Sequence, residues 1–330
     1  MATITSGFGS SHSRMASSPP TVWWDHAHHD QQNYELLGVD GAFHSYDELL
    51  ALADTAVLAE ITAERWQSKH AEIQRAIETL KDDFAGQQPD IAIIVGDDEL
   101  ELFSNSCLPA FAVHWGPELT EYPPSTEEVE ALSPSLRAAL WAEHGEQPEA
   151  YACSVELGRH LIEYLMESDF DVAQTTEQHP SRSVGHAFTF VRRRIMADAV
   201  APILPVFVNT YYPPNQPSPR RCFQLGQALR RGVESWSQVA SVAIVASGGL
   251  SHFVVNEELD RHVLDCLERH DADGLMSIPR RFMRSGTSEV LNWLVLAGAT
   301  EKLELRYAHY IAGYRSPAGT GIGLAFAHLS

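Results

Sequence analysis

The sequence lacks any continuous apolar run of about 18 residues, the length that a membrane-spanning helix requires. Its N-terminus has neither a basic stretch nor a continuous apolar stretch, so it does not resemble a secretory leader. Basic residues are also scarce, because 23 Lys and Arg stand against 44 Asp and Glu, giving a net charge of −21. Nucleic acids and anionic membranes attract the opposite charge, so we expect neither as a partner. We expect a cytoplasmic protein.

Cysteine is equally sparse, with four residues in a chain of 330 and no pair at CxxC spacing. Scattered cysteines of this kind do not predict a zinc site or a framework of disulfides. We therefore expect reduced, mostly buried thiols. The four residues are Cys107, Cys153, Cys222 and Cys266.

What the sequence does contain is an alternation of buried strands and amphipathic helices. Asp90–Val95 and Ile203–Tyr211 are short apolar runs that predict buried strands. Thr62–Phe84 carries apolar residues at steps of three and four, which predicts a helix with Thr62 as its N-cap. No repeat period or long polar linker divides the chain. The sequence predicts one large α/β domain over 1–330, with a central mixed sheet flanked by helices and an active site at strand-end loops.

The stretch Val242–Phe253 is a predicted strand that runs into the sequence Ser-Gly-Gly-Leu-Ser-His-Phe. Gly248 and Gly249 allow a tight turn and a close approach to a ligand, because they carry no Cβ. His252 follows this turn, where open α/β sheets place their chemistry, and imidazole exchanges protons near neutral pH. The alternative is a capping turn with a hydrogen-bonded structural histidine.

Other ionisable residues also follow predicted strands or open helices. His12 lies in a small-residue turn after the first predicted strand, and His186 lies in a Gly-His turn. Asp97–Glu99 are three consecutive carboxylates at a strand end, where their repulsion is usually tolerated only for a cation or a helix cap. Glu289 shares a helix face with apolar residues, which is costly unless the carboxylate is paired or bound to metal. The alternatives are acids that cap a helix over Glu99–Phe103, and an exposed acid in the first turn of its helix at Glu289.

These residues suggest a metal site with open coordination positions. One histidine with two carboxylates, or two histidines with one carboxylate, is the ligand set of a non-haem iron or manganese centre. Histidines left beside such a site would serve as acids or bases. A further histidine group, His26, His28 and His29, lies in the polar segment Trp23–Ala42. Spacings of two and one on a proline-flanked segment are more typical of a solvated loop than of a metal site.

Several short motifs occur in a fixed order along the chain. They are Ser10-Ser11-His12, Val184-Gly185-His186, the block from Asn209-Thr210-Tyr211-Tyr212-Pro213-Pro214 to Arg221-Cys222-Phe223, Gly248-Gly249-Leu250-Ser251-His252, and Glu289 with Trp293-Leu294. In this order they resemble the class III extradiol ring-cleavage dioxygenases, with the protocatechuate 4,5-dioxygenase β subunit as reference and the 3-O-methylgallate dioxygenase type as the nearest subgroup. The resemblance runs from residue 3 to about 327, with extra sequence at 20–60 and 115–150.

The resemblance implies a role for each matching residue. His12 and Glu289 match iron ligands of the family. His252 matches its catalytic acid–base histidine, and His186 matches a second active-site histidine. The implied cofactor is Fe(II), with Mn(II) as the alternative ion.

The third metal ligand is where the chain departs from the family pattern. The family's Asn-Asp-His is here Asp97-Asp98-Glu99, so Glu99 stands in the place of a histidine. Glu99 could bind the metal directly, or Asp98 or a histidine of the inserted segment, such as His44, could fill the position. A more anionic ligand set holds a hard divalent ion readily.

The implied activity is extradiol cleavage of a catechol- or gallate-type ring with O2 in aromatic catabolism, with His252 as base and then acid. Arg315, Ser316 and Tyr212 match the regions that contact the substrate. Arg315 could meet a substrate carboxylate, or it could be an exposed surface residue. The chain is expected to complete its own pocket, with the inserted segments as a lid, and to form a homo-oligomer, most simply a dimer.

Two other interpretations are compatible with the sequence. A metal-dependent hydrolase or lyase acting on C–C or C–N bonds would keep the fold and the metal without oxygen chemistry, and Asp97–Glu99 favours it. A binding or scaffold protein would have lost the site. The presence of His12, His186, His252 and Glu289 argues against that loss.

Overall fold

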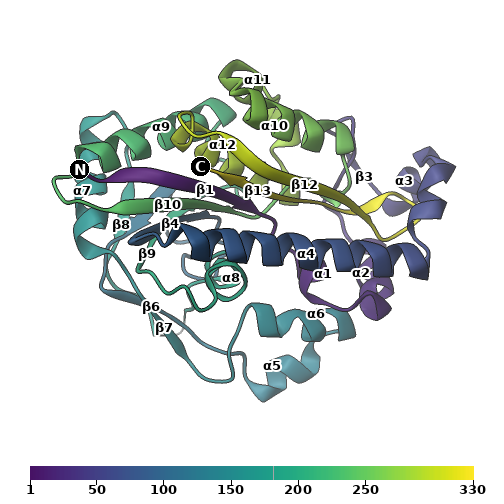
Figure 1. The fold of residues 1–330 in the computed structure, drawn as a ribbon. Helices are drawn as coiled ribbons and strands as arrows, with labels where there is room; N and C mark the ends of the chain where they lie inside the picture. Colours follow the sequence, from purple (N-terminus) through teal and green to yellow (C-terminus); the bar gives the residue numbers. More distant parts are fainter. Residues whose placement is uncertain (181) are drawn as a thin grey trace.

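The computed structural model describes residues 1–180 and 182–330, and a mixed sheet forms its centre (Figure 1). In spatial order the strands are β11 (His252–Val254), β13 (Thr320–Leu329), β1 (Thr3–Ser10), β10 (Ser241–Ser247), β4 (Ile91–Gly96), β9 (Ile203–Val208), β5 (Phe111–His114) and β8 (Ala173–Thr175), while β12 (Leu305–Tyr314) pairs with β13. The central strands β1, β10, β4 and β9 are parallel, whereas β13 is antiparallel to β1 and β5 is antiparallel to β9. The predicted α/β domain with a mixed sheet is confirmed.

The central parallel strands are buried on both faces. Every residue of β4 and β9 is buried, which explains why these strands appear in the sequence as continuous apolar runs. Because they are parallel and in register, the carboxyl ends of β1, β10 and β4 lie beside one another. The loops that begin there carry His12, Gly248 and Asp97.

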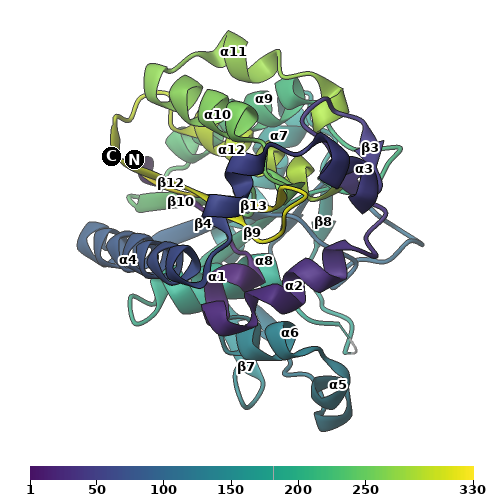
Figure 2. The ribbon, with the colours of Figure 1, turned by 90° about the vertical axis from the view of Figure 1, so that its right-hand side faces the viewer.

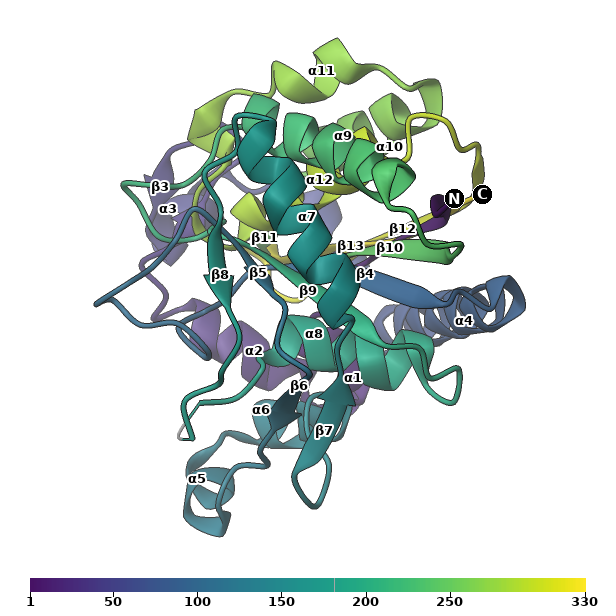
Figure 3. The same ribbon diagram turned by 90° about the vertical axis from the view of Figure 1, so that its left-hand side faces the viewer.

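Helices cover both faces of the sheet (Figures 1 and 3). On one face lie α7 (Val155–Glu167), α9 (Pro219–Ser235), α10 (Glu257–Arg269), α11 (Ala272–Met276) and α12 (Val290–Ala299). On the other face lie α1 (Arg14–Ser17), α4 (Ala63–Gln87) and α8 (His186–Phe190). Alternate residues of β4 enter the two cores, since Ile93 packs in the first and Ile94 in the second.

The long helix α4 confirms the predicted helix. The Thr62 side chain caps it by accepting a hydrogen bond from the Arg65 backbone N–H. Ile73, Leu80 and Phe84 are buried along the predicted apolar stripe. In the part of the chain that the structure describes, no helix is long and apolar enough to cross a membrane. The cysteines are free thiols, and three of the four are buried, as expected.

The two inserted segments form small structures of their own. Segment 20–60 lies at the end of the molecule toward which β1 runs (Figure 2). It contains a 3-10 turn (Pro20–Val22), α2 (Trp23–Asp30), β2 (Leu36–Leu37), β3 (Phe43–His44), α3 (Tyr46–Leu52) and a 3-10 turn (Thr55–Glu60). Segment 115–150 contains β6 (Glu118–Glu121), α5 (Thr126–Ala131), α6 (Pro134–Ala139), a 3-10 turn (Leu140–Ala142) and the first half of β7 (Glu149–Ala152). Helix α6 packs beside α1 and α2.

The expectation of a solvated loop around His26 is wrong. Trp23–Asp30 is the helix α2, in which His26 and Asp30 are buried while His28 and His29 are exposed. Burial is possible because tertiary partners satisfy the polar groups, as the Ser18 hydroxyl does for the His26 ring at 3.2 Å.

Candidate metal centre and active site

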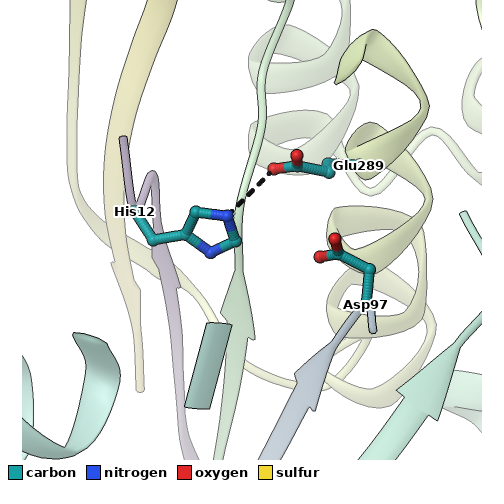
Figure 4. A group of neighbouring side chains, drawn as sticks. All are labelled: His12, Asp97 and Glu289. Carbon is teal, nitrogen blue, oxygen red and sulfur yellow. Dashed lines mark ion pairs between the residues drawn. The ribbon is translucent and has the colours of Figure 1, made fainter. Parts of the chain in front are cut away.

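Three buried side chains converge where the parallel strands end (Figure 4). His12 follows β1, Asp97 follows β4, and Glu289 ends a 3-10 turn (Ser285–Glu289) that leads into α12. One ligand atom from each side chain lies within 4.8 Å of the others. The sequence brings them together because parallel strands end at one edge and α12 packs against β10, β1 and β4.

The surroundings of His12 fix its tautomer. The Ser247 hydroxyl donates its hydrogen to the Ala187 carbonyl at 2.5 Å, so it accepts from His12 Nδ1 at 3.0 Å. Nε2 then carries the lone pair, and it faces Glu289 Oε2 at 3.4 Å. Burial lowers the pKa of His12 to about 4, so the ring is neutral at physiological pH. A neutral imidazole held by a hydrogen bond through its other nitrogen is the usual state of a histidine metal ligand.

Glu289 is a buried carboxylate surrounded by donors. The Gly249 backbone N–H donates to Oε2 at 2.6 Å, and His252 Nε2 lies 2.9 Å from Oε1. Burial alone would raise the pKa of Glu289, but the charge of His252 and the hydrogen bonds from His252 and the Gly249 N–H lower it to about 2. Gly248 is required beside it, because its φ is +112° and a Cβ would lie 2.4 Å from Oε2. The alternative of an exposed first-turn acid is wrong for Glu289.

Asp97 completes the group and leaves one oxygen unsatisfied. Its Oδ1 accepts a hydrogen bond from the Asn292 amide at 3.3 Å, whereas Oδ2 is buried without a hydrogen-bond partner. Burial raises the pKa of Asp97 well above its usual range. An unsatisfied buried carboxylate oxygen is costly, and a bound cation would relieve that cost. One neutral nitrogen and two carboxylates also match the donor preference of first-row divalent ions, so these residues fit a metal.

His186 stands beside this group, and the carboxylate of Glu101 holds it in place. Glu101 accepts from His186 Nδ1 at 2.8 Å and from the His186 backbone N–H at 3.2 Å. The ring of His186 lies edge-on to the ring of His12, with centroids 4.6 Å apart. Burial opposes protonation, but the charge of Glu101 raises the pKa of His186 well above its usual value. Gly185 permits the approach, since a Cβ there would lie 2.7 Å from Glu101 Oε2.

His252 is fixed through both its backbone and its ring. The Thr287 hydroxyl accepts from the His252 N–H at 3.0 Å and donates to its carbonyl at 2.8 Å. Nδ1 lies 3.1 Å from the Leu250 carbonyl, and Nε2 faces Glu289. Because both nitrogens face acceptors, this geometry suits the imidazolium form. Burial lowers the pKa of His252, but the charge of Glu289 outweighs burial and raises it overall.

A cavity of about 330 Å³ lies against the metal-ligand group. Its size suits a small ligand such as a single aromatic ring. We call the residues nearest the ligand group the inner end, namely His12, Glu99, His186, His252 and Glu289. We call the opposite side the outer wall, which includes Arg14, His26, His29, Asp30, Asn33, Leu136 and Arg315.

Comparison with known proteins places this geometry in a family. Residues 62–324 match the family described as the catalytic LigB subunit of aromatic ring-opening dioxygenase. The chain belongs to this family. A gallate dioxygenase of Pseudomonas putida (KT2440) is 33% identical over 181 residues, which cover 50% of this chain and 50% of that protein. The chain thus spans about half the length of the curated relative that it matches.

The third ligand position in this LigB-family chain differs from the expectation. The structure groups Asp97, and not Glu99, with His12 and Glu289. Glu99 lines the cavity, and no hydrogen bond or ion pair joins its carboxylate to another described residue. The carboxylate of Asp98 accepts from the backbone N–H groups of Leu102 and Phe103 at 2.7 and 3.0 Å. It therefore caps a turn, although no helix forms over 99–103.

The other alternative for this position, His44, is also outside the ligand group. It pairs with Asp40 at 3.0 Å in segment 20–60.

The residues expected to contact substrate lie at different depths. Arg315 lines the cavity but is buried in an ion pair with Asp30, so it is not an exposed surface residue. Ser316 is buried and shares a hydrogen bond of 2.7 Å with the hydroxyl of Thr320. Tyr212 is not among the cavity-lining residues, although burial and the nearby carboxylates raise its pKa to about 12.

Among the site residues of this LigB-family chain, Asp97 was identified from the sequence only as one of the three carboxylates Asp97–Glu99, and Glu101 was not identified. The sequence feature that could have selected Asp97 is its position as the first residue after β4, because the strand itself places that residue. Glu101 has no signal, since it lies in an irregular loop and acts through contacts with residues 84 and 85 positions away.

Proposed function

We propose that the protein is a non-haem Fe(II)-dependent dioxygenase that cleaves a catechol- or gallate-type ring outside the diol. The observation that carries this proposal is the buried His12, Asp97 and Glu289 group with its unsatisfied Asp97 oxygen, which borders a cavity that also holds two histidines. Membership of the LigB family supports the same reaction class.

His12 Nε2, an Asp97 oxygen and a Glu289 oxygen would hold the metal, as Fe(II) or alternatively Mn(II). When bound, the ion would supply a Lewis acid and a redox centre at which diol and O2 meet. Three protein ligands on an octahedral ion leave positions for both reactants. The neutral state of His12 favours this role because a proton on Nε2 would compete with the metal.

His252 is the proposed acid–base residue. Its Nε2 lies 2.9 Å from a ligand oxygen of Glu289, so a substrate hydroxyl directed at the ligand group would come within its reach. With the charge of Glu289 that raises the pKa of His252 offset by a bound metal, Nε2 would be free to accept the hydroxyl proton and later return it, a role typically worth about 10²–10⁴-fold in rate. The Leu250 carbonyl and Thr287 keep the ring in position throughout.

His186 is proposed to stabilise negative charge in the cavity. Glu101 occupies its Nδ1, which leaves Nε2–H as the donor available to a bound anionic oxygen. Because the ion pair between Glu101 and His186 is shielded from solvent, the donor is charged and fixed before the substrate arrives.

The test is turnover of catechol and gallate by the Fe(II)-loaded protein, with O2 uptake and the yellow ring-fission product recorded together. We expect one O2 consumed for each ring opened and no reaction in anaerobic buffer. The two-carboxylate ligand set also suits a metal-dependent hydrolase or lyase. Product formation without O2 would contradict the dioxygenase and favour that second function.

A further inference from the structure

Two arginine side chains line the cavity, and a buried carboxylate neutralises the first of them completely. Arg315 donates from Nε and Nη2 to the two oxygens of Asp30 at 2.7 and 2.6 Å. Thr320 adds a third hydrogen bond to Asp30. The side chains of Arg315 and Asp30 are only 6% and 2% exposed, so the pair is hidden from water. Such a bidentate pair uses two of the five N–H donors of the guanidinium and balances its charge.

The second arginine is also paired with a buried carboxylate from another segment, although its own side chain is 45% exposed. Arg14, which follows His12, donates from Nε and Nη2 to Glu143 at 2.9 and 3.3 Å. Glu143 is buried. Asp30 belongs to the inserted segment 20–60 and Glu143 to the inserted segment 115–150. Each inserted segment therefore places one carboxylate on an arginine of the cavity.

The other ionisable groups of the outer wall supply no cation in a fixed position that could compensate the charge of a substrate carboxylate. His26 bonds to the Ser18 hydroxyl, and burial lowers its pKa to about 3, so it is neutral. His29 is exposed at the rim. Glu99 faces the cavity as a third carboxylate without a hydrogen-bond partner among the described residues. A carboxylate on a bound ring would meet two occupied guanidinium groups and one further acid.

We propose that the cavity accepts aromatic diols whose ring bears an uncharged substituent and discriminates against ring carboxylates, with Asp30 and Glu143 as the specificity-determining residues. This inference rests on the proposed ring-cleaving function and refines its substrate class. Its physical basis is that a carboxylate buried against the outer wall, where each guanidinium is already paired, loses its hydration without compensation from a free cation there. The charged donor of His186 lies at the inner end of the cavity. The inference also replaces the expectation that Arg315 binds a substrate carboxylate.

The first test compares substrates that differ in this charge and in one methyl group. The Fe(II)-loaded protein is assayed with 3,4-dihydroxybenzoate against its methyl ester, and with gallate against methyl gallate. We expect kcat/KM to favour the ester in both pairs by at least about tenfold, which corresponds to about 1.4 kcal/mol. Equal values, or a preference for the acids, would overturn the proposal.

The second test releases one arginine at a time. Asp30→Asn and Glu143→Gln each free a guanidinium, and we expect the ester-to-acid ratio of kcat/KM to fall by about tenfold or more. Glu163→Gln is the matched control, because it removes a carboxylate from an exposed pair with Arg159 at 2.9 Å, away from the cavity. Folded Asp30→Asn and Glu143→Gln proteins with the wild-type ratio would overturn the assignment of these residues.

Loss of a buried partner can also unfold a protein, so circular dichroism and thermal melts accompany the assays. If Asp30→Asn does not fold, the double variant Asp30→Asn/Arg315→Gln removes the charged pair together. It should retain the ester preference, because no guanidinium is released. A double variant that prefers the acids would contradict the proposal.

A measurement of binding affinity tests the charge selectivity independently of the proposed ring-cleaving function. Anaerobic titration of the Mn(II)-loaded protein by calorimetry measures affinity for each acid and ester without turnover. Tighter binding of the esters supports the charge selectivity even if no substrate consumes O2, in which case the dioxygenase function fails alone. Turnover with O2 but tighter binding and faster cleavage of the acids supports the function and overturns the selectivity.

Discussion

The ligand group beside the inner end of the cavity and the outer wall differ in how fully the carboxylate oxygens of their aspartates are hydrogen-bonded. Beside the inner end, in the ligand group that includes His12 and Glu289, Asp97 keeps an oxygen buried without a hydrogen-bond partner. On the outer wall, both oxygens of Asp30 are fully used by Arg315 and Thr320. An unsatisfied buried group is costly and is retained where a ligand completes it, whereas a satisfied pair shapes a wall and cancels its charge. We therefore assign the reaction to the ligand group and the choice of substrate to the outer wall.

The two regions also differ in how the chain builds them. The residues of the inner end stand where elements of the central fold begin or end. The outer wall depends on α2 and on Glu143, which belong to the inserted segments. Substitutions at the inner end should therefore remove activity, and substitutions on the outer wall should change which substrate is used.

The largest effect is expected for His12→Ala, which removes the nitrogen ligand of the metal group. Because a catalytic metal contributes several kcal/mol, kcat/KM should fall by at least about 10³-fold, together with loss of bound Fe(II). Metal analysis and O2 uptake measure both. His29→Ala, on the outer wall, should affect both far less. Equal losses of activity and bound Fe(II) in His12→Ala and His29→Ala would contradict the separate roles of the inner end and the outer wall.

His252→Ala should lower kcat by about 10²–10⁴-fold while the metal content stays at the wild-type level, because in the proposed function His252 moves protons and does not bind the ion. The measurement is steady-state kinetics with metal analysis on the same preparation. His44→Ala is the control, since His44 pairs with Asp40 outside the cavity. Loss of metal in His252→Ala would show that this histidine is a ligand.

Glu101→Gln should lower kcat by about 10–100-fold, the range found when a group that orients an active-site residue is changed. The amide can still accept from His186 Nδ1 but no longer supplies the charge that favours the imidazolium. We expect KM to change much less than kcat. A change in KM alone, with kcat intact, would contradict the positioning role of Glu101.

The outer wall should also have a pH signature in stability. Burial lowers the pKa of His26 from 6.5 to about 3, so the unfolded chain takes up a proton first as the pH falls. His26 therefore destabilises the folded state progressively from about pH 6.5 downward, by a few kcal/mol at most. Urea unfolding at pH 7 and pH 4.5 should show a smaller loss of stability in His26→Gln than in the wild type.

The wild type must be compared with His26→Gln because the carboxyl groups of Asp97 and Asp260 have the opposite effect on stability at low pH. Burial raises the pKa of both carboxyls, that of Asp260 to about 6, so they favour the folded state at low pH. Their contribution is the same in the wild type and in His26→Gln. An identical pH dependence in both proteins would show that His26 does not titrate between the two states.

The sequence predicts the central strands and the long helix α4 well, because local hydrophobic patterns determine these elements. Continuous apolar runs mark the buried strands β4 and β9, and the stripe of α4 marks its buried face. Helix α2 escapes prediction because its buried stripe is Trp23, His26 and Asp30, which has helical spacing but is mostly polar. Only tertiary partners make such a stripe a core face.

The candidate site is predictable in part for a related reason. His12 and Glu289 could be chosen because the first follows a predicted strand, the second opens a predicted helix, and the resemblance to the extradiol dioxygenases matches both to iron ligands. The choice among Asp97, Asp98 and Glu99 could not be made, because three neighbouring carboxylates differ only in the direction that the backbone gives each one. Asp98 caps a turn and Glu99 faces the cavity, which leaves Asp97 for the ligand group.

The most direct measurement is therefore the metal affinity of Asp97→Asn beside that of Glu99→Gln, by anaerobic calorimetry with Fe(II) or Mn(II). Asp97 belongs to the ligand group and Glu99 does not. Asp97→Asn should weaken binding by more than about 100-fold, beyond the loss typical of residues that only support a ligand. Glu99→Gln should stay close to wild type. Tight binding by Asp97→Asn with loss of binding in Glu99→Gln would contradict the proposed metal centre.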